Sequence, residues 1–366
     1  MLIAEIIHFL ETIAPPSLQE DYDNAGLITG NKQMNCTGAL ISLDCIESII
    51  DEAIAKNCNL IIAHHPIVFK GLKKINGNNY VERSIIKAIK NDIAIYAIHT
   101  NLDNVLQGVS GKMANMLGLE NVQILSPQKN ILQKLIVFSP NEYAEKLTQA
   151  LFAAGAGHIG NYSNCSFTSM GIGTFKPELG ANPKKGAIGI KEILPETKIE
   201  VIFPNWLQGQ IINAMKANHP YQTVAYDLYN LNNEFAETGS GAVGYLPKPM
   251  DEKVFLAHLS TIFKIKLVKH TSFTGKMIKK VALCGGAGSF LINTAKAVGA
   301  DIYISADMKY HEFFGADGQL VLADIGHFES EQYTIDLLFE LLSDKFPNFA
   351  LLKTSINTNP VEYFVL

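Results

Sequence analysis

Histidines and carboxylates stand directly after three predicted strands that lie far apart in the chain. They are His64 and His65 after the run 59–63, His99 and Asp103 after the run 93–98, and His327, Glu329 and Glu331 after the run 318–326. Ligands of open parallel sheets bind beyond the carboxyl ends of the strands. We therefore expect these side chains to converge on one edge of a sheet.

The local sequence allows neighbouring residues of this set to share a site. Adjacent residues of a regular strand point to opposite faces, but Pro66 restricts His65 to extended geometry and cannot donate a strand hydrogen bond. We expect the strand to loosen there, so that His64 and His65 both turn towards one site. His327 and Glu331 are four residues apart at a predicted helix start, so both can lie on one helical face.

The donor set favours metal binding. Even without His99 and with only one of the two glutamates, three imidazoles and two carboxylates remain, which is too many for one tetrahedral catalytic ion. With a bridging carboxylate they can hold two ions. Nitrogen and oxygen donors without thiolates suit Zn, Fe, Mn, Co or Ni. A single strand-end histidine is more often a capped or core residue, but histidines at three strand ends favour a metal site. Spacing alone does not choose between Glu329 and Glu331, nor decide whether His99 is a ligand.

Two further groups receive weaker interpretations. Asp307 and His311 follow another predicted strand, and we expect them to lie on the surface or behind the ligands. The turn 285–289 is glycine-rich and could cradle a phosphate, but it lacks the lysine of a P-loop and the third glycine of a dinucleotide site. A closely packed turn is the favoured interpretation. The five cysteines form no CxxC pair, which indicates reduced, mostly buried thiols.

Short apolar runs alternate with helical patterns at both ends of the chain. The order over 38–101 is β-α-β-α-β, and strands and helices alternate again over 279–345. This pattern is typical of an α/β fold with a mostly parallel sheet covered by helices on both faces. The order over 128–238 is instead β-α-β-β-α-β, the ferredoxin-like α+β pattern. We therefore predict a main domain formed by 1–127 and 239–366, interrupted by an insert at 128–238.

Composition excludes several classes of protein. The 366 residues are 48% hydrophobic and 18% charged, which argues against disorder. The net charge is −5 and no long basic run occurs, so nothing indicates nucleic-acid binding. No apolar run approaches the roughly 20 residues that span a bilayer. The first predicted helix, 1–16, is amphipathic and has no basic start, so it does not resemble a signal peptide. We expect a soluble, cytoplasmic protein.

Several passages carry a resemblance to a known family. They are 23–27, 61–66, 98–103 and 326–331, and in the insert 173–175, 180–183, 219–221 and 225–227. On these passages the chain resembles the GTP cyclohydrolase 1 type 2 homologue family, the Nif-three-like dinuclear-metal proteins. The likeness extends over nearly the whole chain, and its order is preserved.

The resemblance implies a specific metal site. Two divalent ions per subunit would be bound by a ligand set that comprises His64, His65, Asp103, His327 and Glu331. Glu331 would bridge both ions. His99 would stand beside the ions without being a usual ligand, as a catalytic proton-transfer residue or as a support for the ligands.

The resemblance also implies an assembly and a reaction. The assembly is a toroidal homohexamer, and the insert is similar to the PII/CutA fold. The family name implies hydrolytic ring opening of a small-molecule substrate, possibly GTP, with release of formate. A general two-metal phosphoesterase or amidohydrolase is the enzymatic alternative. The other class is a non-enzymatic, metal-dependent assembly or regulatory protein.

Overall fold

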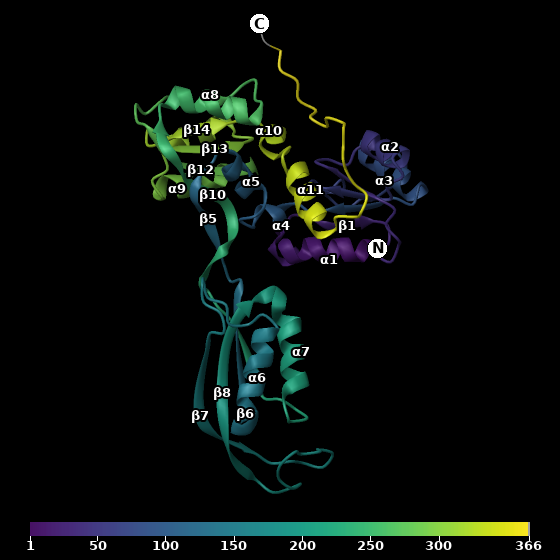
Figure 1. The fold of residues 1–366 in the computed structure, drawn as a ribbon, viewed down its shortest axis with the longest axis vertical. Coiled ribbons are helices and arrows are strands. Elements are labelled where there is room, and N and C mark those ends of the chain that lie inside the picture. The colour runs from purple at the N-terminus through teal and green to yellow at the C-terminus, as the bar shows by residue number, and fades with distance from the viewer. Residues whose placement is uncertain (365–366) are drawn as a thin grey trace. The chain divides into compact units, whose positions relative to one another are not determined.

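The computed structural model describes residues 1–364, which divide into two compact units (Figure 1). The first unit is built from Met1–Pro127 and from the chain that follows Ala236, and the second unit is Gln128–Ala236. The first division coincides with the expected start of the insert at 128, and the second lies slightly before the expected end at 238. Each unit has its own hydrophobic core.

The first unit contains a five-stranded sheet near the N-terminus. Its strands, in spatial order, are β1 (Gly26–Thr29), β4 (Ala94–Ala97), β3 (Leu60–Ala63), β2 (Ala39–Ser42) and β15 (Leu351–Lys353). All neighbours are parallel except β1, which pairs with β4 in the antiparallel direction. Helices α2 (Glu47–Ala55) and α3 (Tyr80–Lys90) connect the parallel strands. The predicted β-α-β-α-β order is confirmed.

Burial on both faces explains why these strands read as continuous apolar runs. Every residue of β2, β3 and β4 is buried, as expected for parallel strands covered by helices. On one face Leu40, Ile61 and Ile95 pack in the same core as Ile49 of α2 and Ile85 of α3. The sheet is therefore rigid up to the residues at which its strands end.

The first unit also contains a six-stranded mixed sheet. Its strands, in spatial order, are β11 (Lys269–His270), β14 (Val321–Asp324), β13 (Ile302–Ala306), β12 (Ile278–Ala287), β10 (Glu234–Met250) and β5 (Glu120–Lys129). β12, β13 and β14 are parallel, whereas β10 and β11 run antiparallel to their partners. Helix α8 (Glu252–Phe263) contributes Phe255, Leu259 and Phe263 to the core on this sheet.

The presence of two sheets corrects one expectation. The three strand ends were predicted to share one edge of one sheet, but β3 and β4 belong to the five-stranded sheet and β14 to the six-stranded sheet. The strand patterns are local, and they do not reveal how a chain divides its strands between sheets.

The remaining helices of the first unit are short or lie at its ends. They are α1 (Ile3–Ile13), α4 (Thr100–Asp103), α5 (Val109–Met116), α9 (Ile292–Ala297), α10 (His327–Glu331) and α11 (Thr334–Lys345), with 3-10 turns at Pro16–Leu18, Ser289–Leu291 and Tyr310–Ala316. Two of them, α4 and α10, directly follow the ends of β4 and β14. They carry both predicted carboxylate ligands, Asp103 and Glu331.

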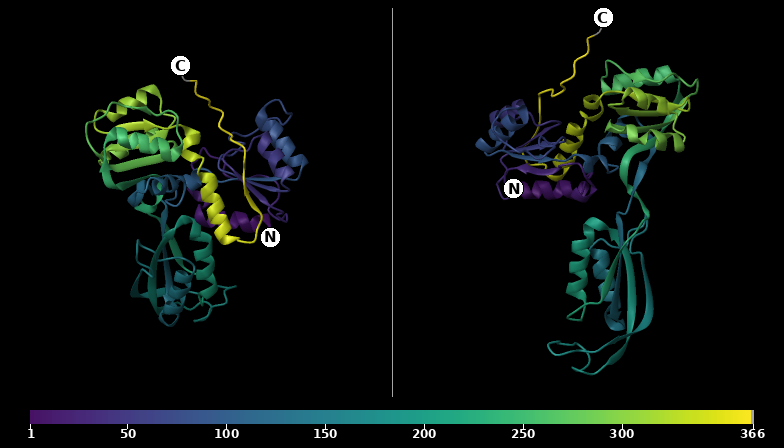
Figure 2. Two further views of the ribbon diagram at one scale, coloured as in Figure 1. Left: turned by 45° about the horizontal axis from the view of Figure 1, so that its top comes forward. Right: turned by 180° about the vertical axis from the view of Figure 1, so that it is seen from behind.

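The second unit has the ferredoxin-like order. Its elements are β6 (Leu132–Pro140), α6 (Asn141–Ala153), β7 (Ser166–Phe175), β8 (Glu192–Pro204), a 3-10 turn (Asn205–Leu207), α7 (Gln208–Asn218) and β9 (Tyr226–Asn230). The spatial order is β7-β8-β6-β9, and all neighbours are antiparallel. Helices α6 and α7 lie side by side on one face of the sheet (Figure 2). The predicted β-α-β-β-α-β pattern is confirmed.

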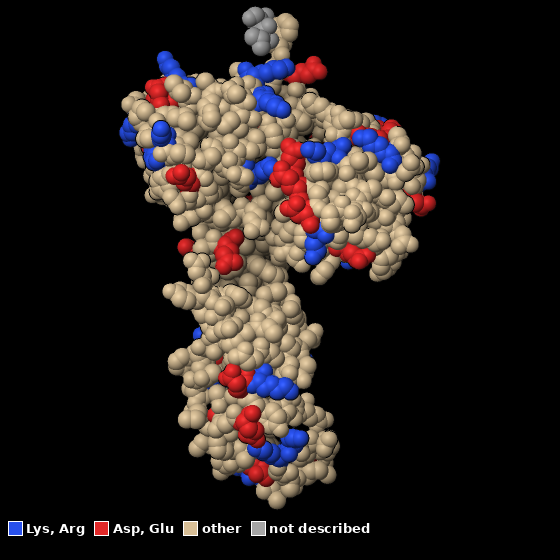
Figure 3. Space-filling model, viewed as in Figure 1, with Lys and Arg blue, Asp and Glu red and all other residues tan. Residues whose placement is uncertain are grey.

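The surface carries charges of both signs. On the face shown in Figure 3, Lys and Arg are interspersed with Asp and Glu in small groups. Within residues 1–364, no helix is both long enough and apolar enough to cross a membrane.

Candidate metal centre

Both predicted histidines after β3 belong to one cluster of potential metal donors, and His65 also lines the adjoining cavity. The strand ends at Ala63, and His64 and His65 lie in the bend that follows, as expected from Pro66. Their ring centroids are 5.0 Å apart. His64 is fully buried, and its Nδ1 lies 2.8 Å from the carbonyl oxygen of Ile98. That hydrogen bond leaves Nε2 of His64 as the atom that faces the cavity.

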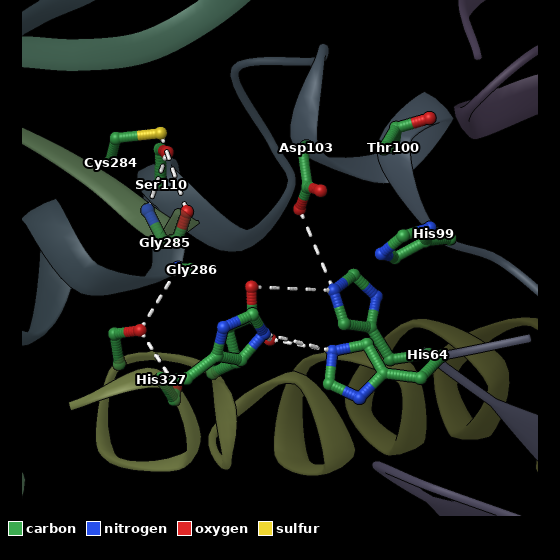
Figure 4. Close-up of polar contacts among 12 residues, drawn as sticks. His64, His99, Thr100, Asp103, Ser110, Cys284, Gly285, Gly286 and His327 are labelled. Atoms are coloured by element: carbon green, nitrogen blue, oxygen red, sulfur yellow. Dashed lines mark hydrogen bonds and ion pairs between the residues drawn. The ribbon is translucent and has the colours of Figure 1, made fainter. Parts of the chain in front are cut away.

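Two buried polar atoms in this cavity have no hydrogen-bond partner among the described residues. They are Nε2 of His64 and Oδ1 of Asp103, which lie 3.6 Å apart (Figure 4). A buried polar atom without a partner costs roughly 1–3 kcal/mol. A cation between the imidazole nitrogen and the carboxylate oxygen would satisfy both atoms. The residues present therefore fit a metal ion.

Glu331 links the two sheets at this site. Its Oε2 lies 2.8 Å from Nε2 of His65 and 3.0 Å from Nε2 of His327, and its Oε1 lies 3.9 Å from Nε2 of His64. His327 and Glu331 occupy one face of α10, as their spacing predicted. The side chain of Glu331 is 3% exposed, so its charge is held inside the molecule.

The donors form small groups that could each hold a metal ion. One group is His64, Asp103 and Glu331, another is His65, His327 and Glu331, and a third is His64, His65 and His99. Within each group the donor atoms lie within 4.8 Å of one another. Glu331 belongs to both groups that contain carboxylates.

The Nδ1 atoms of His65 and His327 are held by hydrogen bonds to carboxylates. Nδ1 of His65 lies 2.8 Å from Oδ1 of Asp44, and Nδ1 of His327 lies 2.8 Å from Oδ2 of Asp307. Histidines that bind metals usually donate their second N–H to a carboxylate or carbonyl, which fixes the tautomer and the ring orientation. Asp307 therefore lies behind the candidate ligand, as expected, whereas His311 is exposed and lies against Tyr310 and Phe314.

The pKa values show how strongly this cavity favours positive charge. Burial lowers the pKa of His65, but hydrogen bonds to Asp44 and Glu331 outweigh it and raise the pKa to about 9. Burial likewise opposes a charged His327, yet its carboxylate partners raise the pKa to about 11. Burial and the charge of Glu331 raise the pKa of Asp103 to about 7. Carboxylates that stabilise protonated imidazoles in this way equally attract a bound cation.

His99 lies beside the candidate ligands and is held by Asp23, the first residue of a passage that carries the resemblance but was given no role at the site. Its ring centroid is 5.3 Å from that of His64 and 5.5 Å from that of His65. Nδ1 of His99 lies 2.7 Å from Oδ1 of Asp23, whose other oxygen accepts hydrogen bonds from the backbone and hydroxyl of Thr100. Burial raises the pKa of Asp23, but these hydrogen bonds outweigh it and lower the pKa to about 2. Asp23 is therefore ionised and fixes the orientation of His99.

Asp44 was also missed, although a signal for it existed. It closes the apolar run that begins at 38 and forms β2, just as His64 closes the next run, so the same strand-end argument applies to it. The sequence contains no spacing that pairs Asp44 with a histidine. The pairing with His65 arises only because β2 and β3 are parallel neighbours.

The glycine-rich turn after β12 is a packing element. The backbone N–H groups of Gly285, Gly286 and Gly288 donate to the hydroxyls of Ser110, Ser330 and Ser305, so they are already used within the chain. A Cβ at Gly286 would clash with Oε1 of Glu331, and the φ of this residue is +61°. The turn therefore allows close approach to Glu331, and the idea that it cradles a phosphate is not supported.

A cavity of about 400 Å³ gives access to the site. Its lining includes His65, His99, Asp103, His327 and Glu331. Three aromatic side chains also line it: Tyr22 is 65% exposed, Phe69 44% and Phe290 67%. They come from three separate loops, so the opening of the cavity is flanked by flat apolar surfaces.

Comparison with known proteins shows the family to which the chain belongs. The model of the Duf34/NIF3 (NGG1p interacting factor 3) family matches residues 1–360. The chain belongs to the Duf34/NIF3 family. The resemblance inferred from the sequence is thereby confirmed. A relative from Bacillus subtilis (strain 168), named GTP cyclohydrolase 1 type 2 homolog, is 38% identical over 366 residues, with 98% of each chain covered.

Other relatives of this Duf34/NIF3 protein are similar over their whole length. A homologue of the same name from Halalkalibacterium halodurans is 39% identical over 364 residues, again with 98% of both chains covered. The crystal structure of a Bacillus cereus protein related to NIF3 is 39% identical, with a TM-score of 0.85 and coverage of 100% of this chain and 99% of that one. A Staphylococcus aureus structure is 29% identical, with a TM-score of 0.79 and the same coverage. The mixed α/β fold is therefore shared across the family.

Proposed function

We propose that this protein is a metal-dependent hydrolase with a dinuclear centre that acts on a nucleotide or a related small molecule. The observation that carries this proposal is that two groups of potential metal donors share Glu331. One ion would be held by His64, Asp103 and Glu331, and the other by His65, His327 and Glu331. A carboxylate shared in this way is the usual bridge of a two-metal site.

The donor chemistry fits Zn, Fe, Mn, Co or Ni, because it combines imidazole nitrogens with carboxylate oxygens and contains no thiolate. When bound, a pair of such ions supplies Lewis-acid polarisation of the substrate and activation of water near neutral pH. Asp44, Asp307 and the carbonyl of Ile98 keep the three ligand histidines in the orientation that presents Nε2 to the cavity.

His99 would act as the residue that moves a proton. Its Nδ1 is held by Asp23, so Nε2 is the nitrogen left to face substrate. A histidine positioned by a carboxylate within reach of the reacting atoms is a typical general acid or base. This role agrees with the position of His99. It lines the cavity but belongs to neither of the two donor groups that include Glu331.

The aromatic side chains favour a substrate with a planar ring. Tyr22 and Phe69 lie with ring centroids 6.2 Å apart, and Phe290 lines the same cavity. Aromatic rings recognise flat ligands by offset or edge-on stacking. The relatives are named after GTP cyclohydrolase 1 type 2, and a purine nucleotide is a compatible candidate. Ring opening of GTP would consume water and release formate.

The test is a formate assay with GTP on protein loaded separately with Zn, Mn, Fe or Co, after the metal content has been measured. We expect two ions per chain, turnover with at least one metal, and loss of the second ion and of activity in Glu331→Gln. Glu329→Gln is the matched control, because Glu329 lies on the same helix and belongs to none of the donor groups. Absence of formate with every metal would exclude GTP as the substrate.

The non-enzymatic alternative predicts a different result in cells. If the protein is a scaffold or regulator, a phenotype of the deletion should be rescued by His65→Ala and Glu331→Gln variants. If it is a metal enzyme, these variants should fail to rescue while they retain the assembly of the wild-type protein.

A further inference from the structure

The insert contains a second cavity, which the proposed reaction does not use. Its volume is about 280 Å³. Residues at three places form most of its lining: Thr174 and Phe175 at the end of β7, Ala181 to Lys185 in the β7–β8 loop, and Tyr221 to Thr223 before β9. These segments overlap with 173–175, 180–183 and 219–221, three of the passages of the insert that carry the family resemblance. Because they are separated in sequence and converge on one cavity, they indicate a binding site.

A carboxylate lies in this cavity, and the backbone makes room for it. Glu196 of β8 lines the cavity, and it pairs with Gly171 of β7, two residues before Gly173. A Cβ at position 173 would clash with Oε2 of Glu196. Among the described residues, Glu196 forms no ion pair with a lysine or arginine. Its negative charge is therefore unneutralised inside a partly enclosed space.

Tyr221 places a second polar group next to this carboxylate. Its hydroxyl is buried beside the carboxylate of Glu196. Burial, together with the neighbouring Glu196, raises the pKa of Tyr221 to about 12, so the hydroxyl keeps its proton. The hydroxyl and the carboxylate therefore offer a ligand a donor and several acceptor positions at one place in the cavity.

The aromatic wall of the cavity is held firmly. The backbone N–H of Tyr221 donates to Nδ1 of His219 at 3.1 Å, and Nε2 of His219 donates to the carbonyl of Phe138 at 2.9 Å. The ring of Tyr221 lies 5.2 Å from that of His219 and 5.8 Å from that of Phe175. With Phe138 and Phe175 also in the lining, the wall offers a preformed surface for a flat apolar group.

The two lysines of the lining do not make this an anion site. Lys184 and Lys185 are exposed in the loop, and Lys185 is paired with Glu142 at 2.7 Å. The loop is tied to the opposite wall by the backbone N–H of Asn182, which donates to Oε1 of Gln222 at 3.0 Å. The unpaired carboxylate of Glu196 is more buried than either lysine, so a cationic group is favoured inside.

We propose that this cavity binds a small amine with a flat, apolar body. The protonated amine would meet Glu196 and the body would lie against Phe138, Phe175 and Tyr221. A charge-assisted hydrogen bond to a partly buried carboxylate is stronger than a neutral one. The volume lies just below the range of about 300–1,000 Å³ typical of pockets for drug-sized ligands, which suits a ligand of the size of a single substituted ring.

The experiment is isothermal titration of the full-length protein with three probes of nearly equal shape. Tyramine carries a positive charge, tyrosol is neutral, and 4-hydroxyphenylacetate is negative. We expect tyramine to bind saturably with a Kd of about 1 mM or below, tyrosol to bind about tenfold more weakly, and the acid to give no saturable heat. Equal binding of tyramine and tyrosol, or no binding of tyramine, would overturn the proposal.

Three variants test whether tyramine binds in this cavity. Glu196→Gln should remove the preference for tyramine over tyrosol, whereas Glu200→Gln should leave it unchanged. Glu200 lies on the same strand but outside the lining, where it pairs with Lys134 and Lys198. His65→Ala should bind tyramine as the wild type does, because the metal centre lies in the other unit. Retained preference in a folded Glu196→Gln protein, or its loss in His65→Ala, would contradict this site.

Discussion

At the scale of single residues, the metal centre depends on side chains that are not themselves ligands. Asp44 and Asp307 each hold the Nδ1 of a candidate ligand, and Asp23 holds that of His99. Each carboxylate fixes a ring orientation that would otherwise be free to rotate. Replacing one of the two carboxylates that hold candidate ligands should therefore lower the affinity for metal and leave the fold unchanged.

Asp44→Asn tests this dependence. The amide can still accept or donate one hydrogen bond, but it removes the charge that supports His65 and leaves the ring less firmly oriented. We expect metal affinity, measured by competition with a chromophoric chelator, to fall about 10–100-fold. Asp336→Asn serves as control, since Asp336 lies on the surface and its one ion pair among the described residues is with Lys353. Unchanged affinity in Asp44→Asn would show that the hydrogen bond to His65 is dispensable.

At the scale of elements, one buried carboxylate joins helix α2 to the segment that follows β15. Glu52 accepts hydrogen bonds from Lys56 at 2.6 Å, from the backbone of Ser355 at 2.9 Å and from its hydroxyl at 2.7 Å, and it also contacts the hydroxyl of Thr354. Its side chain is 7% exposed. Burial raises the pKa of Glu52, but the hydrogen bonds outweigh it and lower the pKa from 4.5 to about 2.

Stability should therefore depend on pH through Glu52. A carboxyl group whose pKa is lower in the folded state stabilises the protein above its unfolded pKa, and this contribution is lost as the pH falls from 4.5 towards 2. We expect Glu52→Gln to lower the free energy of unfolding by up to about 3 kcal/mol at neutral pH. The difference from wild type should shrink below pH 4.5, as measured by thermal unfolding across pH.

The control for this prediction is Asp51→Asn on the same helix. Asp51 is 60% exposed and, within residues 1–364, forms an ion pair only with Lys87, so its removal should change stability little at any pH. If the free energy of unfolding of Glu52→Gln differs from that of the wild type by the same amount from neutral pH down to pH 2, the pH dependence does not come from Glu52.

At the scale of the whole molecule, the second unit exposes apolar side chains along an edge strand. β7 is the last strand of its sheet, and on it Phe167 is 65% exposed, Met170 85% and Ile172 75%. An exposed apolar edge strand is a surface that other chains readily cover. We propose that this surface contributes to the homohexamer that the family resemblance implies.

Sedimentation analysis tests the assembly. We expect the wild-type protein to sediment as six copies of the 40.1 kDa chain. The double variant Met170→Glu and Ile172→Glu should sediment as a smaller species, because it places charges in the proposed interface. Ile54→Glu is the control, since Ile54 is an exposed apolar residue of the first unit. A monomeric wild type, or a double variant of unchanged mass, would contradict the proposed interface.

The sequence by itself predicted much of the local architecture and the candidate ligands. The parallel β-α-β-α-β order and the ferredoxin-like insert follow from apolar periodicity, which neighbouring residues determine. The strand-end argument and the spacing of His327 and Glu331 likewise need only local geometry. The choice of Glu331 over Glu329 required the family resemblance, because spacing alone is compatible with both.

Only the tertiary structure decided how these pieces meet. His65 and Glu331 are 266 positions apart and follow strands of different sheets, yet their side chains are 2.8 Å apart. The partnerships of Asp44 with His65 and of Asp23 with His99, and the insert cavity around Glu196, have no sequence spacing that would reveal them. The physical reason is that periodicity records which face of an element is buried, whereas the contacts across a cavity depend on how separate sheets and loops pack.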